Sequence, residues 1–150
     1  MNARILGALA LALAGFVGVA GAAEMITPGG GSLHFERDLG HNEFNYGLGY
    51  ERDWEDKRFS TAVGVYKNSI RRATFYGLVN WYGLDLGAGF RAGLTGGLMT
   101  GYHKSPVIGT LMPTIEWRYE RVALQSYVVP TIKPYVDGAV VLQVKYIFQQ

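Results

Sequence analysis

The chain of 150 residues contains no cysteine, and its charges are few and nearly balanced, with 14 Lys and Arg against 12 Asp and Glu. The lack of cysteine excludes a disulfide scaffold, a zinc ribbon and a thiol nucleophile. The formal net charge of +2 argues against a nucleic-acid-binding protein, which would carry a basic patch or stripe. The length suits one domain and argues against two full ones.

Glycine and aromatic residues are plentiful instead. The chain has 21 glycines, 10 tyrosines, 7 phenylalanines and 3 tryptophans, and hydrophobic residues make up 49% of it. No collagen-like period explains the glycines. Glycines and aromatics spread over short alternating runs suggest a β-barrel.

Residues 1–23 have the features of a secretory signal peptide. Arg4 supplies a positive charge, residues 5–19 are apolar or small, and residues 20–23 offer small-residue cleavage sites. A retained membrane anchor is the alternative, because the run is just long enough to span a bilayer. Its many alanines and glycines and its processing site favour cleavage, which leaves 24–150 as one exported domain without a further apolar run long enough for a membrane helix.

Alternation with a period of two, the pattern of a β-strand, runs along residues 24–150. In each run, large apolar residues hold one face and small or polar residues hold the other, as in 84–95 and 140–148. A soluble sandwich would show the same alternation with the large residues inside. The glycine-rich face would make a poor core, and aromatics gather near the strand ends, so we expect the large residues to face lipid.

Eight strands are predicted, at 31–38, 44–54, 58–68, 73–83, 84–95, 106–119, 121–130 and 139–148. Short turns are expected at 55–57, near Gly83 and at 120–121, and longer loops at 39–43, 69–72, 96–105 and 131–138. Short turns at one end and longer loops at the other are typical of outer-membrane barrels. The predicted fold is an all-β, eight-stranded antiparallel transmembrane β-barrel.

A barrel of eight strands is just wide enough to be filled by side chains or to hold one small ligand. By parity, its interior residues include Gly47, Gly49, Ala62, Gly64, Gly87 and Gly89. These residues cannot fill the lumen, so we expect a partly empty interior. Apolar residues on the same face are Leu78, Ile108 and Met112. Charged residues on it, expected to pair as a polar plug, are Glu51, Asp85, Arg91, Glu116 and Arg118. Such an interior suits an acyl chain, and a water-filled or loosely packed barrel is the alternative.

Several short segments follow one another in a distinctive order. Ser32-Leu33-His34-Phe35 begins the first predicted strand, Asn42-Glu43 precedes Tyr46-Gly47-Leu48-Gly49-Tyr50 in the second, and Tyr66-Lys67-Asn68-Ser69 ends the third. The runs 86–107 and 124–130 continue the series. Together, over most of 31–148, these segments resemble the PagP family of outer-membrane lipid A palmitoyltransferases.

The resemblance implies a barrel that moves a palmitoyl or similar acyl chain from a glycerophospholipid to lipid A. It implies active groups at the external face, where His34, Asn68 and Ser69 match the family's His, Asp and Ser. It also implies a monomer in the outer membrane of a Gram-negative bacterium, after signal-peptide cleavage, with membrane lipids as partners and no nucleic acid. Neither a cofactor nor a metal is expected.

The chain departs from the family at several positions. Asn68 replaces an aspartate, and an amide cannot carry a carboxylate's charge; Glu36 and Asp38 share the parity of His34 and are candidates to supply it. Residues 24–31 leave no room for the family's amphipathic helix. Asn80 stands where the family has a glycine that helps select chain length, which predicts a shallower pocket. The substrate-binding residues expected are Asn80, Leu78, Gly87, Gly89 and Met112.

Other interpretations stay open. A non-catalytic small barrel, structural or adhesive, would keep the fold without the chemistry, and a lipid A deacylase would use Ser69 with His34. Pro130 lacks the N–H that a strand ladder needs. The resemblance implies a lateral opening for lipid there, and a proline at a strand end is the alternative.

Overall fold

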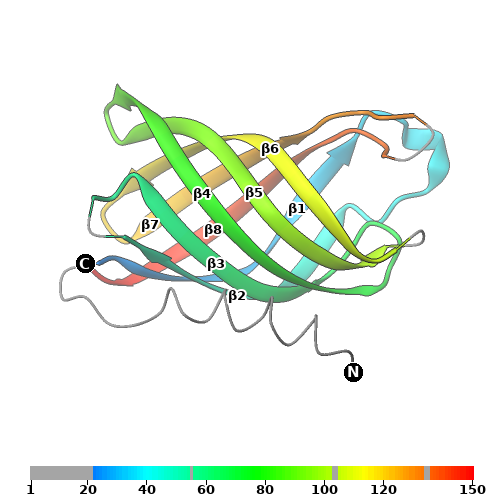
Figure 1. Cartoon of the computed structure of the whole chain (residues 1–150), viewed down its shortest axis with the longest axis horizontal. Coiled ribbons are helices and arrows are strands. Elements are labelled where there is room, and N and C mark those ends of the chain that lie inside the picture. The colour runs from blue at the N-terminus through cyan, green and yellow to red at the C-terminus, as the bar shows by residue number, and fades with distance from the viewer. Residues whose placement is uncertain (1–21, 55, 103–104, 134–135) are drawn as a thin grey trace.

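The computed structural model describes residues 22–150 except 55, 103–104 and 134–135. The eight strands pair antiparallel in chain order, and the last closes onto the first (Figure 1). They are β1 Glu24–His34, β2 Phe44–Asp53, β3 Phe59–Lys67, β4 Ala73–Gly87, β5 Phe90–Tyr102, β6 Ser105–Tyr119, β7 Val122–Val129 and β8 Ala139–Gln149, with a short 3₁₀ helix, η1, at Arg37–Leu39. The predicted all-β, eight-stranded antiparallel barrel is confirmed. Of the predicted signal peptide, residues 1–21 lie outside the described residues.

The first strand is longer at its start than predicted. It begins at Glu24 rather than at 31, so the segment 28–31 is strand, and no helix occupies residues 24–31. The strand is irregular there, because its register against β2 shifts between Thr27 and Gly29. Proline offers no N–H to the ladder and Gly29 has a φ of 115°, which together account for a local bulge.

The predicted turn near Gly83 and the predicted long loop at 96–105 are wrong. Strand β4 continues through Gly83 to Gly87, and β5 runs on to Tyr102. Gly83 serves a different purpose, since a Cβ atom on it would lie 2.6 Å from the Trp81 ring. The hairpin turn falls at Ala88 and Gly89, whose φ values are 50° and 81°. The resulting β4–β5 hairpin projects beyond the rim of the barrel (Figure 1).

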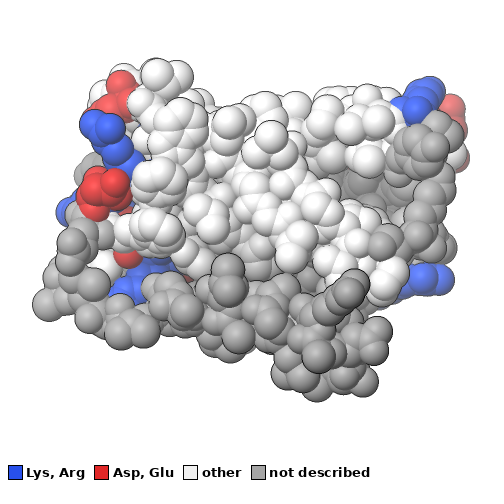
Figure 2. All heavy atoms as spheres, viewed as in Figure 1, with Lys and Arg blue, Asp and Glu red and all other residues white. Residues whose placement is uncertain are grey.

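The outer face of the wall carries large apolar side chains. Leu48, Leu111 and Leu142 are 63%, 65% and 50% exposed. Figure 2 shows charged side chains gathered at the two ends of the visible face and an uncharged band between them. In the described part of the chain, no helix is both long and apolar enough to cross a bilayer.

A buried network of charged residues fills one half of the lumen. Lys145 Nζ donates to Glu51 and, at 2.8 Å, to Glu116. Arg91 and Arg118 donate to the same Glu116, and Arg118 also holds Asp53. We call these six residues the plug: Glu51, Asp53, Glu116, Arg91, Arg118 and Lys145. Three carboxylates thus face three cations, so the plug is neutral.

The plug confirms most of the predicted pairing and corrects one member. Asp85 is exposed on the β4–β5 hairpin, where its Oδ1 accepts from the N–H of Gly87 at 2.9 Å. Asp53 and Lys145 are the additional members. The register of β4 against β5 shifts between Trp81 and Leu84 and again between Asp85 and Gly87, and the parity of the sequence alone does not show such irregularities.

The inward glycines lie against the Tyr76 side chain and the neighbouring strand. A Cβ atom on Gly49 or Gly64 would lie 2.1 or 2.6 Å from the hydroxyl of Tyr76, and one on Gly47 would meet the backbone and Cβ of Tyr66 at 2.6 Å. The prediction that Gly87 and Gly89 line the interior is wrong, because both lie at the hairpin turn.

Pairing between β6 and β7 covers only part of β6. Toward the start of β6, the last pair with β7 is Thr114↔Tyr127. Strand β6 begins earlier, at Ser105, and pairs with β5 between Ser105 and Trp117. Pairing stops next to Pro113, which has no N–H to donate. Pro130 lies just past the end of β7, and β7 pairs with β8 as far as Val129↔Ala139.

Candidate functional site

A cavity of about 560 Å³ occupies the half of the lumen that the plug leaves open. This volume lies within the range of about 300–1,000 Å³ that small-molecule sites have. Its wall is largely apolar and aromatic, with Leu78, Met99, Ile108, Met112, Tyr66, Tyr76, Tyr102 and Tyr127. Leu78 and Met112 therefore line the interior as predicted, whereas Gly87 and Gly89 lie at the far end of the molecule.

Asn80 lies beneath the cavity rather than in its wall. It follows Leu78 by two residues on β4 and is fully buried. Its Nδ2 donates to Glu51 at 3.1 Å and to Ser60 at 3.0 Å, and its Oδ1 accepts from Thr95 and Gln125. Asn80 thus lies between the cavity-lining Leu78 and the plug, to which its hydrogen bond with Glu51 ties it.

The cavity also reaches the unpaired edge of β6. The consecutive residues Ile108, Gly109 and Thr110 all line it, as does Val129 of β7. Consecutive strand residues point to opposite faces, so the cavity extends around the edge of β6. Figure 2 shows the surface hollowed between the wall and the loops at this end.

The mouth of the cavity carries a cluster of polar side chains. Ser69, His34, His41 and Asp137 all line it. The rings of His34 and His41 are stacked with centroids 4.3 Å apart, and His41 Nε2 lies 3.3 Å from Asp137 Oδ2. We call these four residues the mouth cluster.

Backbone hydrogen bonds tie together the three loops that carry the mouth cluster. The Phe35 N–H donates to the Gly138 carbonyl at 2.9 Å, and the Asn42 N–H donates to the Ser69 carbonyl at 2.7 Å. Figure 1 shows the β1–β2 and β7–β8 loops at the same end of the barrel. Residues far apart in sequence are therefore held in one wall.

Asn68 is buried beside this cluster, but its amide is fully used in the β3–β4 turn. Its Oδ1 accepts from the backbone N–H groups of Ile70 and Arg72, at 3.1 and 2.8 Å. Its Nδ2 donates to Thr74 Oγ1 at 3.0 Å and to the Gly101 carbonyl at 3.1 Å. Asn68 thereby fixes the turn that presents Ser69.

Glu36 and Asp38, the carboxylates suggested to replace the family's aspartate, do not line the cavity. Glu36 forms an ion pair with Lys133, and Asp38 is exposed in η1. The carboxylate at the mouth is Asp137. Sequence reasoning missed it together with His41, although both belong to predicted loops at the same end of the barrel as His34.

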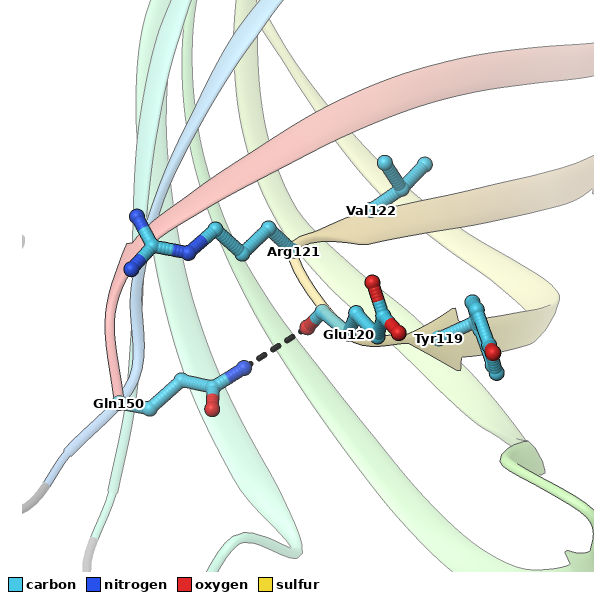
Figure 3. Close-up of a pocket in the computed structure, with 5 residues that line it drawn as sticks. All are labelled: Tyr119, Glu120, Arg121, Val122 and Gln150. Carbon is cyan, nitrogen blue, oxygen red and sulfur yellow. Dashed lines mark hydrogen bonds between the residues drawn. The ribbon is translucent and has the colours of Figure 1, made fainter.

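A second, shallow pocket of about 440 Å³ lies at the opposite end, around the β6–β7 hairpin (Figure 3). Gln150 Nε2 donates to the Glu120 carbonyl there at 2.7 Å, and the Arg121 guanidinium points away from the Glu120 carboxylate. It brings no nucleophile and base together among its five lining residues.

Within the described ranges, no three or more His, Asp or Glu side chains are grouped so as to hold a metal ion. Comparison of the chain with protein-family models and with curated proteins finds no match.

Proposed function

We propose that the protein is an outer-membrane acyltransferase that moves a palmitoyl or similar acyl chain from a glycerophospholipid to lipid A. The observation that carries the proposal is a largely apolar cavity whose mouth holds a serine hydroxyl, two imidazoles and a carboxylate. An apolar cavity suits the hydrocarbon of an acyl chain, and the polar mouth suits the ester at its end.

The outer surface supports a membrane setting. An apolar band flanked by aromatic girdles is typical of barrels in an outer membrane. At the plug end, Trp117 contacts Phe90 and Tyr119, with ring centroids 6.1 and 5.9 Å away. At the mouth end, the rings of Phe44 and Tyr46 are 6.0 Å apart, and Lys67 lies over Tyr46.

The unpaired edge between β6 and β7 supports a lipid substrate. A phospholipid in a bilayer would reach the cavity most directly through the side of the barrel. The incomplete ladder beyond Thr114↔Tyr127 gives such a side opening, and Ile108, Gly109 and Val129 lie along it. The resemblance points to the same kind of opening, which the sequence associated with Pro130.

The transfer itself needs no redox partner. The acceptor hydroxyl of lipid A loses its proton to a base, and its oxygen attacks the ester carbonyl of the donor. The carbon–oxygen bond to glycerol then breaks, and the proton passes to the departing glycerol oxygen. The acyl chain is now esterified to lipid A, and a lysophospholipid leaves. A donor such as the Ser69 hydroxyl would stabilise the negative carbonyl oxygen.

Mass spectrometry of lipid A from cells expressing the protein tests the proposal. A gain of one acyl chain is expected, with loss of that gain in Ser69→Ala. The matched control is Ser126→Ala, a serine on β7 outside the cavity lining. An unchanged lipid A would favour a non-catalytic barrel, and loss of an acyl chain would favour a deacylase; either result rejects the proposal.

The membrane setting has its own test. The protein, expressed with residues 1–23, should fractionate with outer membranes and require detergent for extraction. A protein that stays monomeric in plain buffer would contradict this location.

A further inference from the structure

We propose that His41, held by Asp137, is the base of this site, and that His34 is a positioning residue whose ring fixes the plane of His41. The inference rests on the proposed acyl transfer and assigns the proton-transfer step within it. It differs from what the resemblance implies, which gives that step to His34.

The first support is the contact between His41 and Asp137. Nε2 of His41 lies 3.3 Å from Asp137 Oδ2, and both residues line the mouth. The contact is at ion-pair distance without hydrogen-bond alignment, since Nε2 has no hydrogen bond in the described part of the chain. Catalytic hydrogen bonds are often long or poorly aligned before substrate binds and tighten in the complex.

The second support is that the other candidate groups are committed elsewhere. All four hydrogen bonds of the Asn68 amide go to the β3–β4 turn and its neighbours. Glu36 pairs with Lys133, away from the cavity. Glu43, which also faces His34, is exposed and does not line the cavity. Asp137 lines the cavity and contacts His41, so it is the carboxylate in position to orient an imidazole at the mouth.

The third support is the environment of His34. Its side chain is nearly buried, at 7% exposure, and its Nδ1 has no hydrogen-bond partner among the described residues. Its ring is stacked on His41 rather than joined to it edge to edge. Stacked rings offer no N–H···N line, so His34 supports the orientation of His41 and does not relay its proton.

The fourth support is the link between His41 and Ser69. The residue after His41, Asn42, donates its backbone N–H to the Ser69 carbonyl at 2.7 Å and its side-chain amide to the Asn68 carbonyl at 3.3 Å. The loop that carries the base is thereby fixed to the turn that carries the hydroxyl.

These contacts define the proton's route. When this 3.3 Å contact tightens in the substrate complex, Asp137 accepts from Nε2–H of His41, which leaves Nδ1 as the basic nitrogen. Nδ1 takes the proton of the acceptor hydroxyl as its oxygen attacks the donor ester. The same proton passes to the glycerol oxygen when that bond breaks, so His41 ends neutral as it began.

Paired phenylalanine substitutions separate the two histidines. His34→Phe keeps a ring against His41 and should retain acyl transfer within about tenfold of the wild-type rate. His41→Phe removes the base and should lower the rate by roughly 10²-fold or more, the contribution typical of general base catalysis. Loss of transfer in His34→Phe with transfer kept in His41→Phe would overturn the assignment.

The role of Asp137 is tested by Asp137→Asn, with Asp38→Asn as the matched control on an exposed carboxylate of the same end. Asp137→Asn should slow transfer and Asp137→Glu should partly restore it, while Asp38→Asn changes nothing. ¹⁵N NMR of imidazole-labelled protein in detergent micelles gives a second readout. His41 should carry its proton on Nε2 in the wild type, and Asp137→Asn should shift this tautomer, as an amide can donate as well as accept.

The NMR readout also separates this inference from the proposed function. If the wild type transfers no acyl chain, the proposed function fails, yet the tautomer of His41 still shows whether Asp137 orients it. A wild-type His41 protonated on Nδ1, or a tautomer that Asp137→Asn leaves unchanged, would overturn the pairing even in an active enzyme. Heat-dependent gel mobility of each variant shows that the compared barrels are folded.

Discussion

The hydroxyl of Tyr76 lies 2.1 Å from the position that a Cβ atom would take on Gly49. This hydroxyl is at the flexible end of the tyrosine side chain, and Tyr76 lines the cavity. Gly49→Ala should therefore push the tyrosine ring into the cavity and reduce its volume. Under the proposed function, the transferred acyl chain becomes shorter, as measured by mass spectrometry of lipid A.

Gly31→Ala is the control for this effect. A Cβ atom there would lie 3.5 Å from the Glu43 carbonyl, an ordinary contact, so the chain-length profile should not change. An unchanged profile in Gly49→Ala would mean that Tyr76 does not limit the occupied part of the cavity.

Lys145 is the cation between two buried carboxylates, Glu51 and Glu116. Lys145→Met fits a similar volume but leaves Glu51 without a cation and Glu116 with only its two arginines. Removing one partner from a buried ion pair typically costs about 3–5 kcal/mol. The free energy of unfolding, measured by urea titration of the barrel in detergent, should fall by about this amount.

Lys133→Met is the matched change at an exposed pair. Lys133 contacts Glu36 at the surface, with 71% of its side chain exposed, so the midpoint of unfolding should move little. Equal shifts in the two variants would contradict a structural role for the plug.

Substitutions of Asn68 distinguish the catalytic role that the family resemblance implies from the structural role that its hydrogen bonds in the turn indicate. Asn68→Asp would supply the family's carboxylate, but the new oxygen would face the Gly101 carbonyl, which now accepts from Nδ2 at 3.1 Å. We expect lower stability and no gain in acyl transfer. Asn68→Ala should destabilise by about 1–3 kcal/mol, because it leaves buried backbone groups unpaired. A transfer rate in Asn68→Asp above that of the wild type would contradict this account.

Asn80→Gly should deepen the cavity, because the Asn80 side chain is buried between the cavity-lining Leu78 and the plug. Longer acyl chains should then be accepted, at a cost in stability from the lost hydrogen bonds. Thr95→Val is the control: it removes the hydrogen bond to Asn80 Oδ1 without opening space. A chain-length profile that is the same in Asn80→Gly and the wild type would reject a role of Asn80 in limiting the depth of the cavity.

The alternation of residues predicted the strands, and the glycine-rich face together with the aromatics near the strand ends favoured an orientation with Leu48 and Leu142 outside and Gln143 inside, as the structure has them. The positions of the turns were harder to predict. Glycine is common in turns, but Gly83 lies within β4 and leaves room for the Trp81 ring. This contact joins residues two apart, and periodicity does not encode it.

The partly empty interior was predicted for an incomplete reason. The inward glycines do leave space, but the Tyr76 hydroxyl occupies it beside Gly49 and Gly64, and the neighbouring strand lies against Gly47. The cavity remains because the plug fills only the other half. Which strand's side chains reach across a lumen depends on register and rotamer, and these are not fixed by parity.

Leu78, Met112, His34 and Ser69 were placed at the cavity from the sequence, and all four line it. His41 and Asp137 were not, because each lies in a loop without a periodic pattern. Their proximity depends on the hydrogen bond from Phe35 to Gly138, which joins loops about 100 residues apart.

The neutral plug closes one end of the barrel interior. A molecule that enters at the mouth or beside β6 has no exit past Glu116 and Lys145, which are 0% and 1% exposed. Under the proposed function, the incoming donor and the outgoing lysolipid share the openings of this one half of the barrel, and a slowly departing product would inhibit the next turnover by occupying the cavity.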